Sequence, residues 1–273
     1  MDQKELIDRI VAEVVARMAA EPRSAAGAAG GAGAAGAAAE SGAASLGPRY
    51  TPADVAARID HTMLRPEAPT SAFDTLCDEA LKHHFYSVCV NSCRVAHVAR
   101  RLQGTGVRVC SVVGFPLGAM TRSAKAFETR EAIADGAAEI DMVINIGLLK
   151  TGDTRGVEED IRFVRRATRG NTVLKVIIET ALLTQEEKVL ACEIAKKAGA
   201  DFVKTCTGFS GGGATVDDIT LMRRVVGKDL GVKASGGIRT FKSAVALLEA
   251  GATRIGSAAS VAIVTGAEAT GSY

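Results

Sequence analysis

Short apolar, β-branched runs alternate with amphipathic stretches along the chain from residue 49 to the C-terminus. Runs such as VLKVIIE (173–179) and VRVCSVV (107–113) are almost continuously apolar, which is typical of parallel strands buried on both faces. The stretches between such runs repeat their apolar residues at helical spacing. The predicted strands are 58–62, 85–90, 107–113, 138–145, 173–179, 201–205, 231–235 and 253–256, and the predicted helices include 71–83, 121–135, 155–168, 184–198, 215–226 and 240–250.

Strands that alternate with helices indicate an α/β fold with a parallel sheet. Eight strand–helix repeats within residues 49–273 favour a closed (β/α)8 TIM barrel over an open, doubly wound sheet. An open sheet that binds dinucleotides would be expected to carry a GxGxxG turn after its first strand, and the chain has none there.

Residues 1–20 predict a short amphipathic helix ahead of the barrel. Their apolar residues recur every three or four positions and form one stripe, while charged residues occupy the other side. Two pairs, Glu5 with Arg9 and Glu13 with Arg17, have the spacing and order that stabilise a helix. The stripe consists of Leu6, Ile7, Ile10, Val11, Val14, Val15 and Met18.

Residues 21–48 predict a flexible Ala/Gly/Ser linker. Between Ser24 and Ser45 every residue except Glu40 is alanine, glycine or serine. Each glycine within a helix costs about 1 kcal/mol relative to alanine, so a tether is favoured over a helix. A flexible chain of this length spans roughly 30 Å, and the first helix is therefore expected to be detached from the barrel.

Composition excludes several classes of protein. The formal net charge of the 273 residues is only +2, with no clustered basic face for nucleic acid. No apolar run reaches the roughly 18 residues that cross a bilayer, and acidic residues at the N-terminus do not fit a secretory signal. The six cysteines form no CxxC pair, which argues against structural zinc and for a reducing, cytoplasmic compartment.

Reactive groups gather near the ends of the predicted strands, where TIM barrels carry their chemistry. Lys204 lies late in the sixth strand and Lys233 late in the seventh, while Asp141 and Asp60 lie in the fourth and first. His61, beside Asp60, could also approach the site. A lysine in a buried strand is costly, and a structural ion pair would explain a single case.

Two such lysines on neighbouring strands indicate more than a structural ion pair. Two ammonium groups about 4 Å apart repel by roughly 4 kcal/mol at an effective dielectric near 20, enough to leave one amine uncharged near neutral pH. A neutral amine is the nucleophile of Schiff-base chemistry. The spacing itself leaves open which lysine is the nucleophile and which is its activator.

Glycine-rich loops follow the sixth, seventh and eighth predicted strands. Gly236 and Gly237 in SGGIR, and Gly256 and Ser257 in IGSAAS, resemble the phosphate site that TIM barrels build after strands seven and eight. Without side chains, such residues let backbone N–H groups approach phosphate oxygens. Thr207 and Gly208 after the sixth strand are further candidates for substrate binding. The alternative is that the glycines serve tight turns alone.

Five segments together resemble the deoxyribose-phosphate aldolase family. They are IDHTML (59–64), DMVINIGLLK (141–150), LKVIIET (174–180), FVKTCTGF (202–209) and VKASGGIRT (232–240), and with their spacing they cover about residues 50–270. The resemblance implies a class I aldolase that cleaves 2-deoxyribose 5-phosphate to glyceraldehyde 3-phosphate and acetaldehyde, without metal or cofactor.

The resemblance also implies individual roles. Lys204 would form the Schiff base, and Lys233 would keep it neutral. Asp141 would be the general acid/base, supported by Asp60. The terminal Tyr273 matches a tyrosine that assists proton transfer in many family members, although an ordinary terminus is the alternative. Family members are commonly dimers or tetramers, so a homo-oligomer is expected.

The first 20 residues, with their tether, resemble the encapsulation peptides that direct enzymes into bacterial microcompartments. This resemblance implies shell or cargo proteins as partners, and a shell would confine the acetaldehyde that the reaction releases. An oligomerising helix and a membrane-surface helix are the alternatives. The balanced charges of the polar face argue against an anionic membrane.

Two other functions remain open from the sequence. One is another Schiff-base barrel aldolase, for example for keto-deoxy sugar acid phosphates, which an arginine in the pocket that binds a carboxylate would favour. The other is a non-catalytic cargo or scaffold protein. Both lysines and Asp141 are present, which argues against the second.

Overall fold

A computed structural model describes Ala12, residues 49–168 and residues 170–267. Contacts divide the chain into two units, Met1–Thr51 and Pro52–Tyr273, and the second contains the elements named below. The predicted linker 21–48, all of the predicted helix 1–20 except Ala12, and Tyr273 lie outside the described residues.

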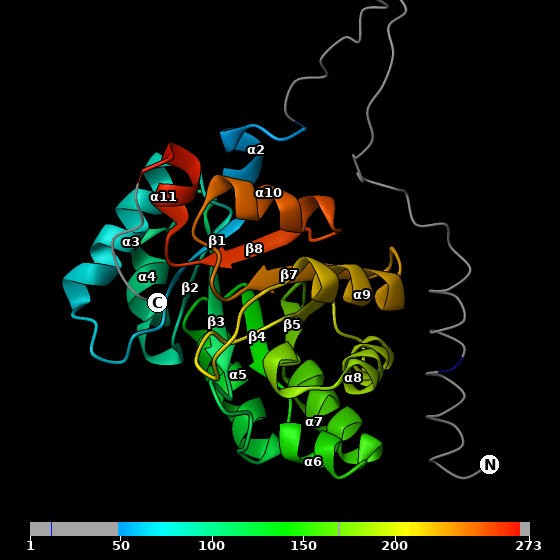
Figure 1. Cartoon of the computed structure of the whole chain (residues 1–273). Helices are drawn as coiled ribbons and strands as arrows, with labels where there is room; N and C mark the ends of the chain where they lie inside the picture. The colour runs from blue at the N-terminus through cyan, green and yellow to red at the C-terminus, as the bar shows by residue number, and fades with distance from the viewer. Residues whose placement is uncertain (1–11, 13–48, 169, 268–273) are drawn as a thin grey trace, which may run out of the picture. The chain divides into compact units, whose positions relative to one another are not determined.

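Eight parallel strands form a closed barrel in which each strand pairs with its neighbours in chain order, β1 to β8, and β8 pairs with β1 (Figure 1). Each predicted strand overlaps an observed one, so the predicted (β/α)8 barrel is confirmed. The strands are β1 (Ile59–Met63), β2 (Ser87–Val90), β3 (Arg108–Val113), β4 (Glu139–Val143), β5 (Val173–Ile177), β6 (Phe202–Lys204), β7 (Gly231–Ser235) and β8 (Arg254–Ser257).

Helices surround the barrel and cover the outer faces of the strands (Figure 1). All six helices named from the sequence are present. They are α3 (Thr70–Lys82), α5 (Arg122–Ala134), α7 (Thr154–Ala167), α8 (Gln185–Lys197), α9 (Val216–Val226) and α10 (Phe241–Glu249). No bounds were predicted for the short elements α2 (Pro52–Ala56), α4 (Val95–Arg101), α6 (Ile146–Lys150), α11 (Ser260–Thr265), η1 (Ser92–Arg94) and η2 (Thr180–Leu182), although the eight strand–helix repeats imply the helices after β2 and β8, α4 and α11. They span seven residues or fewer, too few to show helical periodicity.

Local sequence explains where α8 begins and ends. The Thr184 hydroxyl accepts a hydrogen bond from the backbone N–H of Glu187, whose side chain in turn accepts one from Thr184 N–H. This capping box satisfies two donors that the first turn leaves free. Lys196 and Lys197 in the last turn complement the negative end of the helix dipole. The first and last residues of α8 are therefore determined by its local sequence.

Successive strand residues point alternately into the barrel and toward the helices. In β1, Asp60 lies inside, whereas His61 faces outward, where its ring packs 5.0 Å from that of Phe85 and hydrogen-bonds Glu79 of α3. The expectation that His61 could approach the site is therefore wrong. No helix among the described residues is long and apolar enough to cross a membrane.

Candidate active site

The four polar residues predicted from the strands meet inside the barrel. Asp141 Oδ2 accepts hydrogen bonds from Lys204 Nζ at 2.8 Å and from Lys233 Nζ at 2.7 Å. Lys233 also pairs with Asp60. In register, Lys204 lies directly opposite Lys233 on the adjacent strand. The two lysines therefore share one cavity and one carboxylate oxygen.

Three further charged residues belong to the same cluster and were not predicted. Lys175 of β5 donates to Asp141 Oδ1 at 2.7 Å and pairs with Glu139 Oε2 at 2.6 Å. Arg254 of β8 donates to Asp60 at 2.9 Å and to Glu139 at 3.1 Å. Lys175 carried the signal used for the other lysines, a cation within an apolar strand run, so the sequence could have revealed it.

The cluster is layered along the barrel axis. Glu139 and Arg254 are the first residues of their strands and lie toward the N-terminal end. Lys204 is the last residue of β6 and lies toward the C-terminal mouth, where TIM-barrel chemistry takes place. Asp141 and Lys233 are fully buried, whereas Lys204 keeps a small exposed fraction. Lys204 is thus the amine of the cluster placed to meet a substrate.

Neighbouring charges set the ionisation of the buried carboxylates. Burial alone would raise the pKa of Asp141, but Lys175, Lys204 and Lys233 outweigh it and hold that pKa well below its usual range. Burial likewise opposes ionisation of Asp60, whose pKa is nevertheless lowered by attraction to Lys233, Arg254 and Lys175. Both carboxylates are therefore anions at neutral pH.

The same contacts hold the cations charged. Burial would lower the pKa of Lys233, but Asp141 and Asp60 raise it above the ordinary value. The pKa of Lys175 is raised well above its usual range, because attraction to Asp141, Cys110, Asp60 and Glu139 outweighs the loss of water. The sequence predicts direct repulsion between two ammonium groups, whereas the structure places the Asp141 carboxylate between Lys204 and Lys233.

The buried cluster does not balance its charges when Lys204 is included. The buried cluster holds three carboxylates, those of Asp60, Glu139 and Asp141, and three cations other than Lys204, namely Lys175, Lys233 and Arg254. A protonated Lys204 would leave one uncompensated positive charge in a medium that penalises it. Arg108 approaches Glu139 at 3.7 Å but is 47% exposed, so solvent screens it. The four buried cations therefore outnumber the three carboxylates by one.

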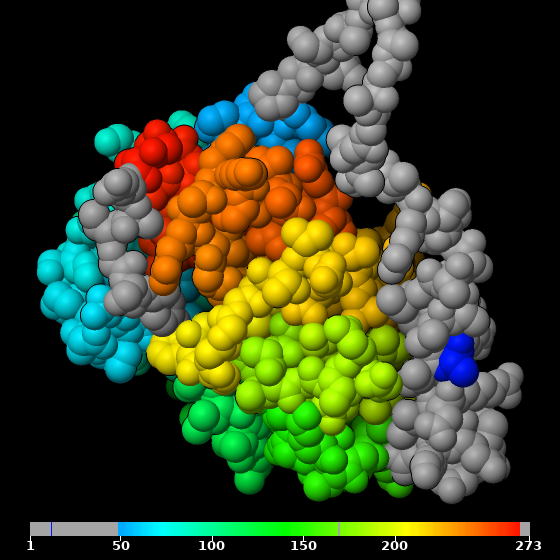
Figure 2. Space-filling model, viewed as in Figure 1, coloured from blue at the N-terminus to red at the C-terminus, as the bar shows by residue number. Residues whose placement is uncertain are grey.

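A small recess of about 140 Å³ opens beside this cluster at the C-terminal mouth of the barrel. Gly236 and Gly237 both adopt positive φ, and the Gly236 carbonyl accepts a hydrogen bond from Ala214 N–H at 3.0 Å, which joins the loops after β6 and β7. The yellow and orange segments that carry these loops lie side by side in Figure 2. The recess is lined by Thr62, Thr207, Gly208, Gly212, Gly236, Gly237, Ile238, Arg239, Ser257 and Ala258.

Two of the predicted phosphate-binding residues have other contacts. The Ser257 hydroxyl donates to the Ile238 carbonyl at 2.7 Å, so its proton is already engaged. Gly256 does not line the recess but lies in β8, where an added Cβ would come within 2.9 Å of Lys233 Cε. Its lack of a side chain makes room for Lys233. Arg239, which was not predicted, is exposed at the recess and supplies a positive charge there.

One group of buried side chains has atoms placed to hold a metal ion. Cys89, Cys110 and Asp141 bring ligand atoms within 4.8 Å of one another. The Asp141 oxygens already accept hydrogen bonds from three lysines, and the Cys110 sulfur lies 3.4 Å from Lys175 Nζ. A metal ion would therefore compete with ammonium groups for the same oxygens.

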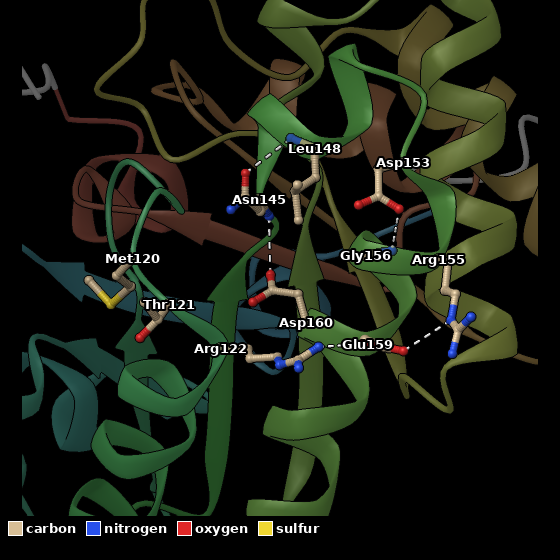
Figure 3. A pocket seen from close by; sticks show the side chains of 10 residues that line it. All are labelled: Met120, Thr121, Arg122, Asn145, Leu148, Asp153, Arg155, Gly156, Glu159 and Asp160. Atoms are coloured by element: carbon tan, nitrogen blue, oxygen red, sulfur yellow. Dashed lines mark hydrogen bonds and ion pairs between the residues drawn. The ribbon is translucent and has the colours of Figure 1, made fainter.

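A larger recess of about 530 Å³ lies outside the barrel, among α5, α6 and α7. Figure 3 shows Arg122 and Arg155 both directed at Glu159, and Asp160 accepting a hydrogen bond from the backbone N–H of Asn145. Asp160 also pairs with the buried Lys125 at 2.6 Å. Each of these charged side chains is paired with one of opposite sign, and none of the predicted site residues lines the recess.

A protein-family model described as DeoC/LacD family aldolase matches residues 55–267. The chain belongs to this family. Deoxyribose-phosphate aldolase 1 of Bacillus licheniformis is 61% identical over 219 residues, which cover 80% of this chain and 98% of that protein. The deoxyribose-phosphate aldolase of Brevibacillus brevis is 58% identical over 214 residues, or 78% of this chain and 96% of that protein.

Two solved aldolase structures have the same fold as this chain. The tetrameric deoxyribose phosphate aldolase from Aeropyrum pernix superposes with a TM-score of 0.74 at 32% identity, covering 78% of this chain and 91% of that one. A second structure, described as QR15, an aldolase, gives a TM-score of 0.74 at 38% identity over 77% of this chain and 94% of that one. The family match begins after the segment predicted to be a helix and a linker.

Proposed function

We propose that this family member is a class I aldolase that cleaves 2-deoxyribose 5-phosphate reversibly to glyceraldehyde 3-phosphate and acetaldehyde. The observation that carries the proposal is the buried charge cluster, in which the Lys204 amine, at the end of β6, shares the Asp141 carboxylate with Lys233. The names of the relatives from Bacillus licheniformis and Brevibacillus brevis support the substrate.

The geometry accounts for each step of such a cleavage. The Lys204 amine attacks the substrate aldehyde, and Asp141, at 2.8 Å, is placed to move the protons that convert the carbinolamine into a protonated imine and water. When the C2–C3 bond breaks, its electron pair enters the imine to form an enamine, and the C3 hydroxyl loses its proton to become the aldehyde of glyceraldehyde 3-phosphate. Protonation of the enamine and hydrolysis then release acetaldehyde and regenerate Lys204.

The other charged groups of the cluster hold Asp141 in position for these proton transfers. Lys233 and Lys175 hold Asp141 as an anion and fix its position, and Asp60 in turn holds Lys233. The neighbouring recess suits the phosphate end of the substrate, because Gly236 and Gly237 expose backbone there and Arg239 adds a cation. The reaction as written needs neither metal nor cofactor.

Borohydride trapping tests the nucleophile. Reduction of the enzyme with acetaldehyde should add one ethyl group to Lys204, identified by peptide mass spectrometry, and Lys204→Met should abolish the adduct. An adduct on Lys233 or Lys175 would refute the assignment. Turnover of 2-deoxyribose 5-phosphate, measured beside a keto-deoxy sugar acid phosphate, tests the substrate, since Arg239 could also bind a carboxylate.

We further propose that residues 1–20 direct the enzyme into a bacterial microcompartment in the cytoplasm by binding shell or cargo proteins. The proposal is supported by the amphipathic pattern of this segment and by the family match, which does not include it. A chain shortened to residues 49–273 should keep its turnover and lose association with shell proteins. Loss of turnover on truncation would contradict the separation of the two roles.

Two more features of the proposed enzyme are open to direct test. A homodimer or homotetramer is proposed, with support from the tetramer described for the Aeropyrum pernix relative, and light scattering measures it. The terminal Tyr273 is proposed to assist proton transfer at the enamine carbon. Tyr273→Phe should slow deuterium exchange into acetaldehyde without changing the borohydride adduct on Lys204, and unchanged exchange would contradict the role.

A further inference from the structure

Glu179, just after β5, is an exception among the buried acidic residues. It is fully buried and adopts a left-handed conformation with φ of 57°. The other buried carboxylates of the described chain each pair with a lysine or an arginine, but no ion pair involves Glu179 there. A buried anion without a cation needs hydrogen-bond donors instead, and a left-handed residue other than glycine persists only where its surroundings hold it.

Among the described residues, the hydrogen-bond donors to the Glu179 carboxylate come from the loop after β6, residues 205–215. Thr207 donates its backbone N–H to both carboxylate oxygens at 3.2 Å and its hydroxyl to Oε2 at 2.5 Å. The Ser210 hydroxyl donates to the same oxygen at 3.4 Å. The loop begins one residue after Lys204, and Thr207 and Gly208 line the recess at the mouth of the barrel.

These contacts decide what the Thr207 hydroxyl can offer a substrate. A hydroxyl has one proton and two lone pairs. The proton goes to Glu179, and one lone pair accepts the backbone N–H of Phe209 at 3.1 Å. Only an acceptor lone pair remains for the recess.

We propose that Glu179 is a positioning residue for the aldol cleavage: it holds loop 205–215 beside Lys204 and accepts the hydrogen bond that the Thr207 hydroxyl donates. The Thr207 hydroxyl is then left to accept a hydrogen bond from a substrate hydroxyl. This inference rests on the proposed function. It predicts that Glu179 matters for sugar substrates, which carry such hydroxyls, and not for acetaldehyde, which has none.

Glu179→Gln is the decisive variant. Both carboxylate oxygens accept from Thr207, and an amide group replaces one of them with a donor. With its nitrogen at the Oε2 position the amide donates to the Thr207 hydroxyl and reverses the polarity of that hydroxyl. With its nitrogen at the Oε1 position the amide faces the Thr207 backbone N–H, which loses an acceptor. We expect kcat/KM for 2-deoxyribose 5-phosphate to fall about 30-fold, mostly through KM, while borohydride trapping of acetaldehyde on Lys204 stays within about twofold of the parent.

A double-mutant cycle on the full-length enzyme separates positioning from a general structural effect. Thr207→Val removes the hydroxyl, and in that background Glu179→Gln should lower kcat/KM no further than about twofold. Asp218→Asn is the matched control, since it removes another buried acid, which pairs with Lys188 on the outer helices. It should lower the thermal midpoint without a selective loss for the sugar.

The outcomes are distinct. Equal losses for sugar turnover and acetaldehyde trapping, or additive effects of the Glu179 and Thr207 substitutions, would overturn the inference while leaving the aldolase intact. Failure of the parent enzyme to trap acetaldehyde on Lys204 would overturn the proposed function itself. Should Glu179→Gln not fold, Glu179→Asp keeps the charge but withdraws it by one methylene, and the same selective loss is expected.

Discussion

Replacing Lys233 with methionine tests the charge balance on which the proposed chemistry depends. In the parent, Lys233 and Lys204 donate to the same oxygen of Asp141, at 2.7 Å and 2.8 Å. Methionine removes the positive charge and keeps much of the volume. The cluster then holds three carboxylates against Lys175, Arg254 and Lys204, so the cations no longer outnumber the carboxylates.

The size of the effect follows from the repulsion that is lost. Two unit charges about 5 Å apart repel by roughly 3 kcal/mol at an effective dielectric near 20, which corresponds to about two powers of ten in an equilibrium constant. Since the neutral amine is the nucleophile, kcat should fall by a similar factor and should recover as the pH is raised.

The assay is the pH dependence of kcat for 2-deoxyribose 5-phosphate between pH 6 and pH 10. Lys233→Met should show log kcat rising with a slope near one over the alkaline range, displaced from the parent profile by about two pH units. Lys188→Met is the control, because this lysine also pairs with a buried acid, Asp218 at 2.6 Å, but lies outside the barrel. A profile for Lys233→Met that is low and flat at every pH would refute the reasoning.

Three further predictions follow from the cluster and its recess. Gly256→Ala should lower kcat at least about tenfold and cost about 1–3 kcal/mol in urea unfolding, because the new Cβ crowds Lys233; unchanged kinetics would contradict this packing. Arg239→Ala should raise KM about tenfold for 2-deoxyribose 5-phosphate but not for 2-deoxyribose, and equal effects on both would exclude a phosphate contact. The lowered pKa values of Asp60 and Asp141 contribute stability that is complete above the unfolded value, about 4, and is lost as the pH falls further. The urea midpoint should therefore drop between pH 5 and pH 3, and a constant midpoint would contradict that contribution.

Much of the architecture was predictable because its signals are local. Strands buried on both faces leave continuous apolar runs, and all eight runs, including 173–179, overlap strands of the barrel. Burying a charged side chain in such a run costs free energy, so its presence there indicates a function. Lys204 and Lys233 do meet at Asp141, as predicted. The bounds of the short helices escaped prediction because one or two turns carry too little periodicity.

Only the tertiary structure decided which charges meet and which way each strand faces. Both faces of a barrel strand are apolar, so the sequence does not say that Asp60 lies inside and His61 outside. Arg254 reaches Asp60 across 194 residues of chain, and no local pattern reveals that contact. The ionisation of the site depends on the sum of all the charges in the cavity, and that sum exists only once the barrel has closed.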